Sequence, residues 1–377
     1  MFQMKNINAV VKNLYKPQYF AINNSKLLFF DIIYKNNKIY LIMPIYNTPA
    51  NPDNIIVRVN NLSLKLTESH VKDSDEPILI YIYEYNSEPN SIIKINVSIT
   101  NNMIKSYEIR HIYINTIPGN NTNTITITNT ITNTITNTNT NKFLALTTLF
   151  KHDYYIFPLF YNYYKYQGVQ HFYMYYNGII TPEISKIFNK PDVTLVEWNF
   201  HYWNPRGTKY AHHAQMGQMH HALYKYGKDI YEYMIFCDLD EYLYIPKNKF
   251  VEPQSQPQPR QQESRYRDNT IREFIKNNNT VDVFGFCNIW ANTINDTIPN
   301  NRQLPNKFLT VSTKNEYKER SKNIYKISSI NTIGVHQTCT DYVGLHCITD
   351  LNMYHFYKWS SKNRTIENCT NIIDLSL

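Results

Sequence analysis

The chain has 377 residues, of which 42% are hydrophobic and 15% aromatic, so buried rings can fill a core large enough for two domains. Its formal net charge is +8, but the Lys and Arg residues are scattered and form no block of like charge, which argues against a nucleic-acid-binding protein. A basic pocket for a phosphorylated ligand and a simple coding bias toward Lys both remain open.

Residues 1–118 consist of short runs rich in Ile, Val and Tyr, separated by Asn, Pro and Ser, and none of them has the period of a helix. Two such runs, 26–34 and 38–46, flank an Asn36-Asn37 turn. Residues of this kind suit pleated, half-buried strands. We therefore expect a small all-β sandwich of immunoglobulin-like type, whose role the sequence leaves unknown.

Residues 119–141 form a low-complexity tract of Asn, Thr and Ile directly after Pro118. We interpret the tract as a linker, because so polar a segment can bury little apolar surface. The alternation of Ile with Thr and Asn permits an edge strand instead. In either case it is expected to be a domain boundary.

From Lys142 to Leu377 the pattern changes to strands that alternate with helices. This alternation predicts an α/β domain with a largely parallel sheet, flanking helices and ligands at the carboxyl ends of the strands. One helix is expected to run from an N-cap at Thr208 to a stop at Gly227. The other expected elements are strands at 143–150, 169–176, 193–198, 233–238 and 281–287, and helices at 153–167, 182–189 and 270–276.

The five cysteines are odd in number and include no C-x-x-C pair, so neither a disulfide framework nor a zinc knuckle is expected. The first residues have no apolar signal-peptide core, and no later run approaches the roughly 18 apolar residues of a membrane span. These features predict a cytoplasmic protein without a transmembrane segment.

The apolar run 233–237 leads into Asp238, Leu239, Asp240 and Glu241. Residues i and i+2 of an extended chain share a face, so Asp238 and Asp240 are expected to present two carboxylates together. Hard oxygen ligands suit Mn²⁺ or Mg²⁺, which can bridge a nucleotide diphosphate and neutralise a leaving group. Asp240 is the expected main ligand, with Asp238 as a second ligand or a ribose contact.

This segment, DLDEYL, resembles the acidic signature of glycosyltransferase family 92 and the related family-2-like group. The resemblance implies an A-type glycosyltransferase fold, a Rossmann-like mixed sheet with flanking helices, over residues 142–377. Departures from the family pattern occur at His152-Asp153, Phe356 and Trp359. The other segments that resemble the family are 149–153, 162–177, 322–336 and 355–360.

The resemblance also implies roles for residues outside the acidic segment. One of His336 and His355 would complete the metal shell through a neutral imidazole, and Asp153 would contact the nucleobase or ribose. Lys358, together with Lys322 or Lys326, would face the diphosphate. The whole implied donor-binding set is Lys151, Asp153, Asn177, Gln215, Gln218, Lys322, Lys326 and Lys358.

An inverting transferase needs a carboxylate base within hydrogen-bond reach of the acceptor hydroxyl. Glu241, Asp296 and Asp341 all remain open for this role. The histidines at 212–213 and 220–221 lack the i,i+4 spacing of a metal pair, so we expect an amphipathic helix that packs on one side and faces solvent on the other. Trp290 is expected to be buried, with stacking on an acceptor sugar as the alternative.

The sequence as a whole predicts a metal-dependent glycosyltransferase that moves a sugar from a nucleoside-diphosphate donor to a glycan, glycoprotein or other hydroxyl acceptor. By resemblance the donor is a uridine sugar and the transfer is inverting. One alternative is a non-catalytic glycan-binding or structural protein with a degenerate transferase domain. Another is a haloacid-dehalogenase-type phosphatase, but Tyr242 stands where that family has Thr. The coding bias is typical of a large DNA virus or an AT-rich microbe.

Overall fold

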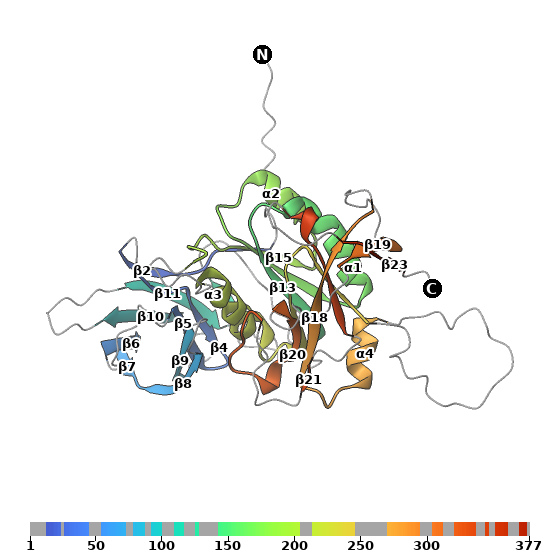
Figure 1. Ribbon diagram of the computed structural model, residues 1–377. Coiled ribbons are helices and arrows are strands. Elements are labelled where there is room, and N and C mark those ends of the chain that lie inside the picture. The colour runs from blue at the N-terminus through green and yellow to red at the C-terminus, as the bar shows by residue number, and fades with distance from the viewer. Residues whose placement is uncertain are drawn as a thin grey trace, which may run out of the picture. The chain divides into compact units, whose positions relative to one another are not determined.

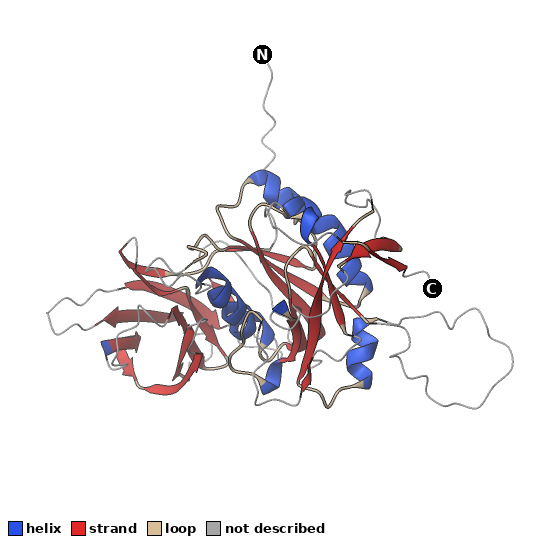
Figure 2. Cartoon of the chain, viewed as in Figure 1, coloured by secondary structure: helices blue, strands red, loops and turns tan. Residues whose placement is uncertain are grey.

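The computed structural model divides the chain into two compact units, and strands predominate among the described residues (Figure 2). Unit 1 comprises Met1–Asn141, Tyr173–Ile230 and Asn331–Ile333, and unit 2 comprises Lys142–Phe172, Tyr231–Ile330 and Gly334–Leu377. The structure describes residues 13–23, 26–44, 54–72, 78–86, 92–99, 109–116, 125–127, 142–203, 213–245, 270–294, 304–311, 320–336, 344–346, 351–360 and 369–374.

The N-terminal strands of unit 1 form two antiparallel sheets, in the orders β4-β5-β9-β8 and β12-β11-β10-β6-β7 (Figure 1). The β4–β5 hairpin turns at Asn36 and Asn37, whose φ angles of 51° and 60° lie in the left-handed region that Asn tolerates. The bounds are β4 (Asp31–Lys35), β5 (Lys38–Pro44), β6 (Ile55–Val59), β7 (Leu62–Leu64), β8 (Leu66–Lys72), β9 (Ile78–Glu84), β10 (Ile92–Ile99), β11 (Ile109–Thr116) and β12 (Ile125–Ile127).

One apolar core joins these two sheets. Leu41 of β5 and Tyr81 of β9 belong to the same buried cluster as Val57 of β6 and Val97 of β10. The alternating pattern of the sequence therefore produces the expected N-terminal β region, with one face of each sheet turned inward.

Part of the low-complexity tract is a strand. Residues 125–127 form β12, which pairs with β11 at the edge of its sheet, as the edge-strand alternative anticipated. The rest of the tract lies outside the described residues. The division of the chain into domains at 119–141 stays a prediction, while the contacts group residues 173–230 with the N-terminal strands.

Unit 1 also contains a short run of strands in the order β1-β15-β14, with β1 parallel to β15. Helix α3 continues directly into the π-helix η4, so the predicted single helix changes its hydrogen-bond pattern midway. The continuous helix has its C-cap at Lys228. The left-handed residue after it is Asp229, with a φ of 65°, whereas the sequence predicted Gly227 as the stop. Thr208 lies outside the described residues. The bounds are β1 (Leu14–Tyr15), β2 (Phe20–Asn23), β3 (Lys26–Phe29), β14 (His171–Tyr176), α2 (Pro182–Ile187), β15 (Val193–Glu197), α3 (His213–His221) and η4 (Ala222–Gly227).

Helix α3 is buried on every side, so the expectation of an amphipathic helix with solvent-facing histidines was wrong. Residues of the N-terminal strand region pack on the side of the helix that was expected to face solvent. Phe30, which is fully buried, lies so close to Gly217 that an added Cβ would stand 2.6 Å from its ring, and its ring centroid is 4.8 Å from that of His213. Burial of this helix depends on residues almost two hundred positions away, which the local pattern does not reveal.

Unit 2 is built on a mixed sheet in which β13-β16-β20-β18-β19-β23 are neighbours in that order. Strands β13 and β16 are parallel, but β20 is antiparallel to both β16 and β18. The sheet is therefore mixed, as the family resemblance implied, and is not largely parallel, as the alternation of strands and helices by itself predicted. Strands β21 and β22 run parallel to β18, and β17 pairs with β22. The bounds are β13 (Lys142–Phe150), β16 (Tyr231–Phe236), β17 (Glu241–Tyr244), β18 (Val283–Asn292), β19 (Lys307–Thr310), β20 (Lys322–Lys326), β21 (Gly344–His346), β22 (Asn352–Phe356) and β23 (Asn371–Asp374).

Two α-helices accompany this sheet, α1 (Phe157–Tyr166) and α4 (Ile271–Asn277), which confirms the mixed α/β class. Helix α1 ends at Tyr166 with Gln167 as its C-cap, and the next residue, Gly168, has a φ of 94°, the left-handed conformation that favours glycine after a helix. Helix α4 begins at Thr270, whose side chain accepts a hydrogen bond from the Glu273 amide at 3.3 Å. These signals were readable in the sequence.

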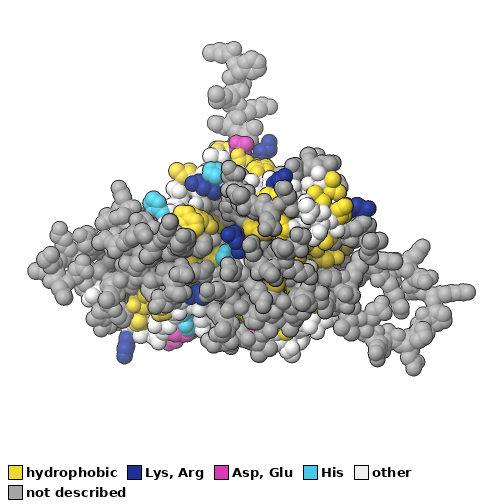
Figure 3. Space-filling model, in the orientation of Figure 1, with side chains coloured by type: hydrophobic (Ala, Val, Ile, Leu, Met, Phe, Trp, Pro, Cys, Tyr) yellow, Lys and Arg dark blue, Asp and Glu magenta, His cyan; other side chains and the backbone are white. Residues whose placement is uncertain are grey.

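No helix in the described part of the chain is long and apolar enough to cross a membrane. On the face drawn in Figure 3, the described Lys and Arg side chains are scattered and do not gather into one patch.

Candidate active site

The acidic segment forms a tight turn between β16 and β17. The Glu241 amide donates to the Asp238 carbonyl at 3.1 Å, and the Asp238 amide donates to Glu241 Oε2 at 2.7 Å. One main-chain bond and one side-chain bond thus close the same four residues. Asp238 and Asp240 follow the carboxyl end of β16, as expected, but the chain turns at Leu239 and Asp240. It is not extended there, so the expectation that the two residues share one face of an extended strand was wrong.

Helix α1 fixes the far side of this turn through its tyrosines. Tyr164 Oη donates to the Glu241 carbonyl at 2.9 Å and accepts from the Leu243 amide at 3.0 Å. Tyr163 Oη donates to the Leu243 carbonyl at 2.6 Å. Because all of these groups are buried, the bonds satisfy polar atoms that water cannot reach. The sequence gave no signal of these hydrogen bonds to the turn.

His355 lies between two carboxylates of the turn. Strand β22 pairs with β17 so that His355 is opposite Glu241. Its Nε2 is 3.0 Å from Asp240 Oδ2 and its Nδ1 is 3.5 Å from Glu241 Oε1. The Trp290 ring packs on the imidazole with the centroids 4.4 Å apart, which sets the orientation of the histidine. Trp290 itself is buried, as expected.

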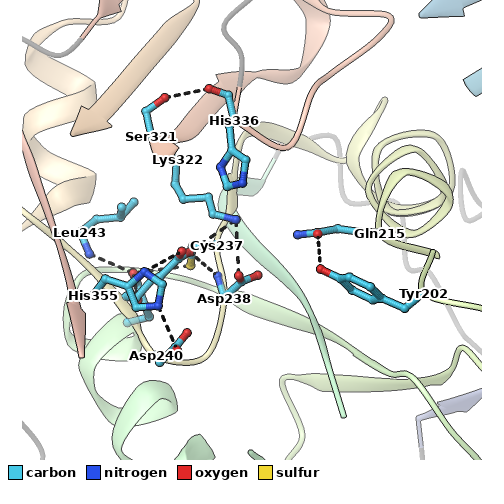
Figure 4. A network of polar contacts seen from close by, with 12 residues as sticks. Tyr202, Gln215, Cys237, Asp238, Asp240, Leu243, Ser321, Lys322, His336 and His355 are labelled. Carbon is cyan, nitrogen blue, oxygen red and sulfur yellow. Dashed lines mark hydrogen bonds and ion pairs between the residues drawn. The ribbon is translucent and has the colours of Figure 1, made fainter. Parts of the chain in front are cut away.

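Lys322 brings a positive charge to the other side of the turn. It opens β20, which is antiparallel to β16, so the start of β20 meets the end of β16 where the carboxylates begin. Its Nζ is 3.6 Å from Asp238 Oδ2 and 3.6 Å from Glu241 Oε2, and only 3% of the side chain is exposed. Figure 4 shows the ammonium directed at the Asp238 carboxylate.

These five side chains, Asp238, Asp240, Glu241, Lys322 and His355, are called the acidic cluster below. Burial raises the pKa of Glu241, as does the Coulombic repulsion from Asp238 and Asp240, while Lys322 and His355 act in the opposite direction. Burial also raises the pKa of Cys237, the residue before the turn, well above its usual value. The cluster therefore holds three carboxylates against one lysine, in surroundings that penalise uncompensated charge.

The donor set decides which metal arrangement fits. Among the described residues, no three His, Cys, Asp or Glu side chains are grouped so that they could hold an ion by themselves. Asp238 and Asp240 offer two carboxylates on one turn, and Asp238 is the more open, with 20% of its side chain exposed. Mg²⁺ commonly takes one or two protein carboxylates and completes its shell with substrate phosphates and water. The two aspartates fit that mode, with His355 oriented toward Asp240.

The other predicted donor contacts of unit 2 lie outside the acidic cluster. Lys326 is at the opposite end of β20 from Lys322, and its Nζ donates to the Asn279 carbonyl at 3.1 Å. Lys358 is exposed in the 3-10 turn that follows β22. Lys151 is exposed and Asp153 is half-buried in the segment between β13 and α1.

His336 stays close to Lys322 in the same unit. Its carbonyl accepts from Ser321 Oγ at 2.9 Å, and Figure 4 shows its ring on the side of Lys322. The described contacts thus connect it to the start of β20, where the lysine of the acidic cluster begins. Asp296 and Asp341 lie outside the described residues.

The remaining predicted donor contacts belong to unit 1 and are engaged within it. Asn177 Nδ2 donates to the carbonyls of Trp198 and Phe200, both at 2.8 Å. Gln215 Oε1 accepts from Tyr202 Oη at 3.0 Å (Figure 4). Gln218 is buried with 2% of its surface exposed.

One protein family has a model that matches this chain. It is glycosyltransferase family 92, and the match covers residues 144–374, which is more than half of the 377 residues and includes the whole acidic cluster. No curated protein matches the chain.

Proposed function

Since the chain belongs to glycosyltransferase family 92, it is a glycosyltransferase, and we propose that it transfers a sugar from a uridine-diphosphate donor to a glycan hydroxyl with the help of Mn²⁺ or Mg²⁺. The observation that supports the finer part of this proposal is the turn that holds Asp238 and Asp240, two positions apart, at a strand end. Two fixed carboxylates with an excess of negative charge favour a divalent cation.

In this proposal Asp238 and Asp240 hold the cation, and His355 keeps the Asp240 carboxylate in one orientation. When bound, the cation neutralises the charge that develops on the diphosphate leaving group. Lys322 adds a fixed positive charge at the same place, because its ammonium is already 3.6 Å from Asp238. Lys358, Lys151 and Asp153 remain proposed donor contacts, and His336 remains a proposed alternative to His355 as a metal ligand.

The proposed reaction is a single displacement. The acceptor oxygen forms a bond to the anomeric carbon while the bond to the diphosphate oxygen breaks, and the electron pair of that bond leaves on the diphosphate. The proton of the acceptor hydroxyl passes to a carboxylate base. Attack from the side opposite the leaving group inverts the anomeric carbon.

Glu241 is poorly suited to be this base. It is 2% exposed, its Oε2 already accepts from the Asp238 amide, and its carboxylate faces both Lys322 and His355. A base must reach the proton of a substrate hydroxyl. Asp296 and Asp341 therefore remain the proposed bases.

The test measures donor hydrolysis and thermal shift of the full chain with a panel of nucleotide sugars, with and without Mn²⁺. Asp240→Ala should abolish metal-dependent turnover and the metal-dependent shift. Glu232→Ala is the matched control, because Glu232 is an exposed carboxylate near the other end of the same strand. It should behave like the wild-type chain.

Metal-dependent turnover of one donor, lost in Asp240→Ala and kept in Glu232→Ala, would support the proposal and identify the donor. Turnover that is independent of added metal and resistant to chelation would refute the metal requirement. An absence of any response to nucleotides or metal would instead favour a glycan-binding protein with a degenerate transferase domain.

A further inference from the structure

The acidic cluster has a charge balance that the proposed metal site alone does not explain. Three carboxylates lie within four residues of the chain, and the ammonium group of Lys322 lies 3.6 Å from two of them. A buried ammonium at a site proposed for a divalent cation repels that cation, and the metal site alone gives no reason for its presence.

The position of Lys322 beside the carboxylates is fixed by the sheet and by the burial of its side chain. Its side chain is 3% exposed, and β20 is paired on both sides, with β16 and with β18. The ammonium is equidistant from Asp238 Oδ2 and Glu241 Oε2, at 3.6 Å from each. A lysine held this way cannot move freely into the solvent, so it stays beside the carboxylates.

Glu241 complements the lysine from within the turn. Its carboxylate accepts from the Asp238 amide at 2.7 Å, and its own amide donates to the Asp238 carbonyl at 3.1 Å. Both bonds act on Asp238, the more exposed of the two aspartates. Glu241 therefore fixes the backbone that carries Asp238, while Lys322 fixes the direction of its carboxylate.

We propose that Lys322 and Glu241 are positioning residues that set the net charge and the geometry of the Asp238–Asp240 pair. Lys322 is a built-in cation that weakens the attraction for a divalent ion and aims Asp238, and Glu241 restores that attraction by one negative charge. The inference rests on the proposed function, because it concerns how this chain tunes the metal affinity of that same site.

The two residues should have opposite effects on metal affinity. Lys322→Met removes a positive charge close to the site, so Mn²⁺ should bind roughly tenfold more tightly, while turnover falls. Glu241→Gln keeps an oxygen that can accept from the Asp238 amide but removes a negative charge, so Mn²⁺ should bind roughly tenfold more weakly. General damage to the fold would weaken binding in both variants.

The experiment measures Mn²⁺ binding by calorimetry on the full-length wild-type chain, both single variants and the double variant. The double variant removes the charges as a pair, so its affinity should return to within about threefold of wild type. Lys326→Met is the matched control, because Lys326 is on the same strand but donates to Asn279, away from the turn. Thermal unfolding of every variant checks that it is folded.

Opposite shifts in the single variants, cancelled in the double variant and absent in Lys326→Met, would support the inference. Weaker binding in both folded single variants, or no change in Lys322→Met, would overturn it. If a single variant does not fold, a double variant whose affinity differs more than tenfold from wild type overturns it as well. A wild-type chain that binds no Mn²⁺ would refute the metal requirement of the proposed function together with this inference.

Discussion

Two buried clusters in this protein contain the same types of side chain and differ in charge balance. The second cluster is in unit 1, where Asp31, with no exposed surface, accepts from Tyr15 Oη at 2.5 Å and from the Gln18 amide at 2.6 Å. His221 Nε2 is 2.7 Å from the same carboxylate, and Lys225 Nζ is 3.6 Å from it. We call these residues the Asp31 cluster.

The Asp31 cluster is balanced. Burial by itself would raise the pKa of Asp31, but Lys225 and the hydrogen bond from His221 outweigh it and lower the pKa. Burial also lowers the pKa of His221, so one carboxylate faces one ammonium and a neutral imidazole. Tyr175 Oη, 2.6 Å from His221 Nδ1, completes the hydrogen bonds of that imidazole. The acidic cluster has the opposite character, because its three carboxylates exceed its lysine.

This difference indicates the use of each cluster. A buried carboxylate whose charge and hydrogen bonds are all satisfied contributes to the fold and has nothing left to offer a ligand. A cluster with excess charge is costly in isolation and gains most from binding a cation. Residue types alone do not separate the two cases, since both contain Asp, His and Lys.

The largest expected effect compares Asp31→Asn with Asp240→Asn. Asp31→Asn leaves Lys225 without its counter-ion and should reduce the free energy of unfolding by roughly 3–5 kcal/mol. Asp240→Asn relieves repulsion within the acidic cluster, so stability should change by less than about 1 kcal/mol while metal-dependent turnover is lost. Urea denaturation of both full-length variants checks this. Equal destabilisation by the two substitutions would contradict the distinction.

A smaller effect is expected from acid, through the histidines of α3. Burial lowers the pKa of His213 to about 3 and that of His220 to about 4. Both values are below the unfolded value near 6.5, so the unfolded chain binds more protons between those limits. The stability that these histidines contribute is complete above about pH 6.5 and is lost as the pH falls toward their folded values, by about 1.4 kcal/mol per pH unit for each.

Unfolding free energies measured between pH 7 and pH 5 check this slope. His213→Phe removes one titrating group next to Phe30. The part of the slope of unfolding free energy against pH that comes from His213 and His220 should therefore fall by about half. A slope in the variant equal to that of the wild-type chain would show that His213 is not buried in its neutral form.

The smallest expected effect tests packing instead of charge in unit 1. Gly217→Ala places a Cβ about 2.6 Å from the Phe30 ring, and that ring is itself held by Trp198 at 5.5 Å. Although alanine favours a helix by about 1 kcal/mol, overpacking should give a net loss of roughly 1–2 kcal/mol in the free energy of unfolding. In a Phe30→Leu background the same substitution should be neutral or stabilising. An equal loss in both backgrounds would assign the effect to something other than this contact.

The sequence predicted most of the elements and the position of the acidic motif at a strand end. Local signals were sufficient for α4, for α1 before Gly168, and for the strand that leads into Asp238 and Asp240. They were sufficient because a cap, a turn or an alternating run is decided by residues within a few positions of one another. Membership of the family followed from short motifs in a fixed order.

Only the tertiary structure decided which charged side chains lie together and which residues are buried. Lys322 and His355 come to the acidic turn from strands that are far from it in the chain, and the sequence could not choose between His336 and His355. Helix α3 read as amphipathic because the strand end that buries it, at Phe30, lies far away in sequence. Burial and charge balance depend on long-range pairing, whereas periodicity and caps are local, and this is why the sequence by itself determined the elements and the acidic motif but not the environment around them.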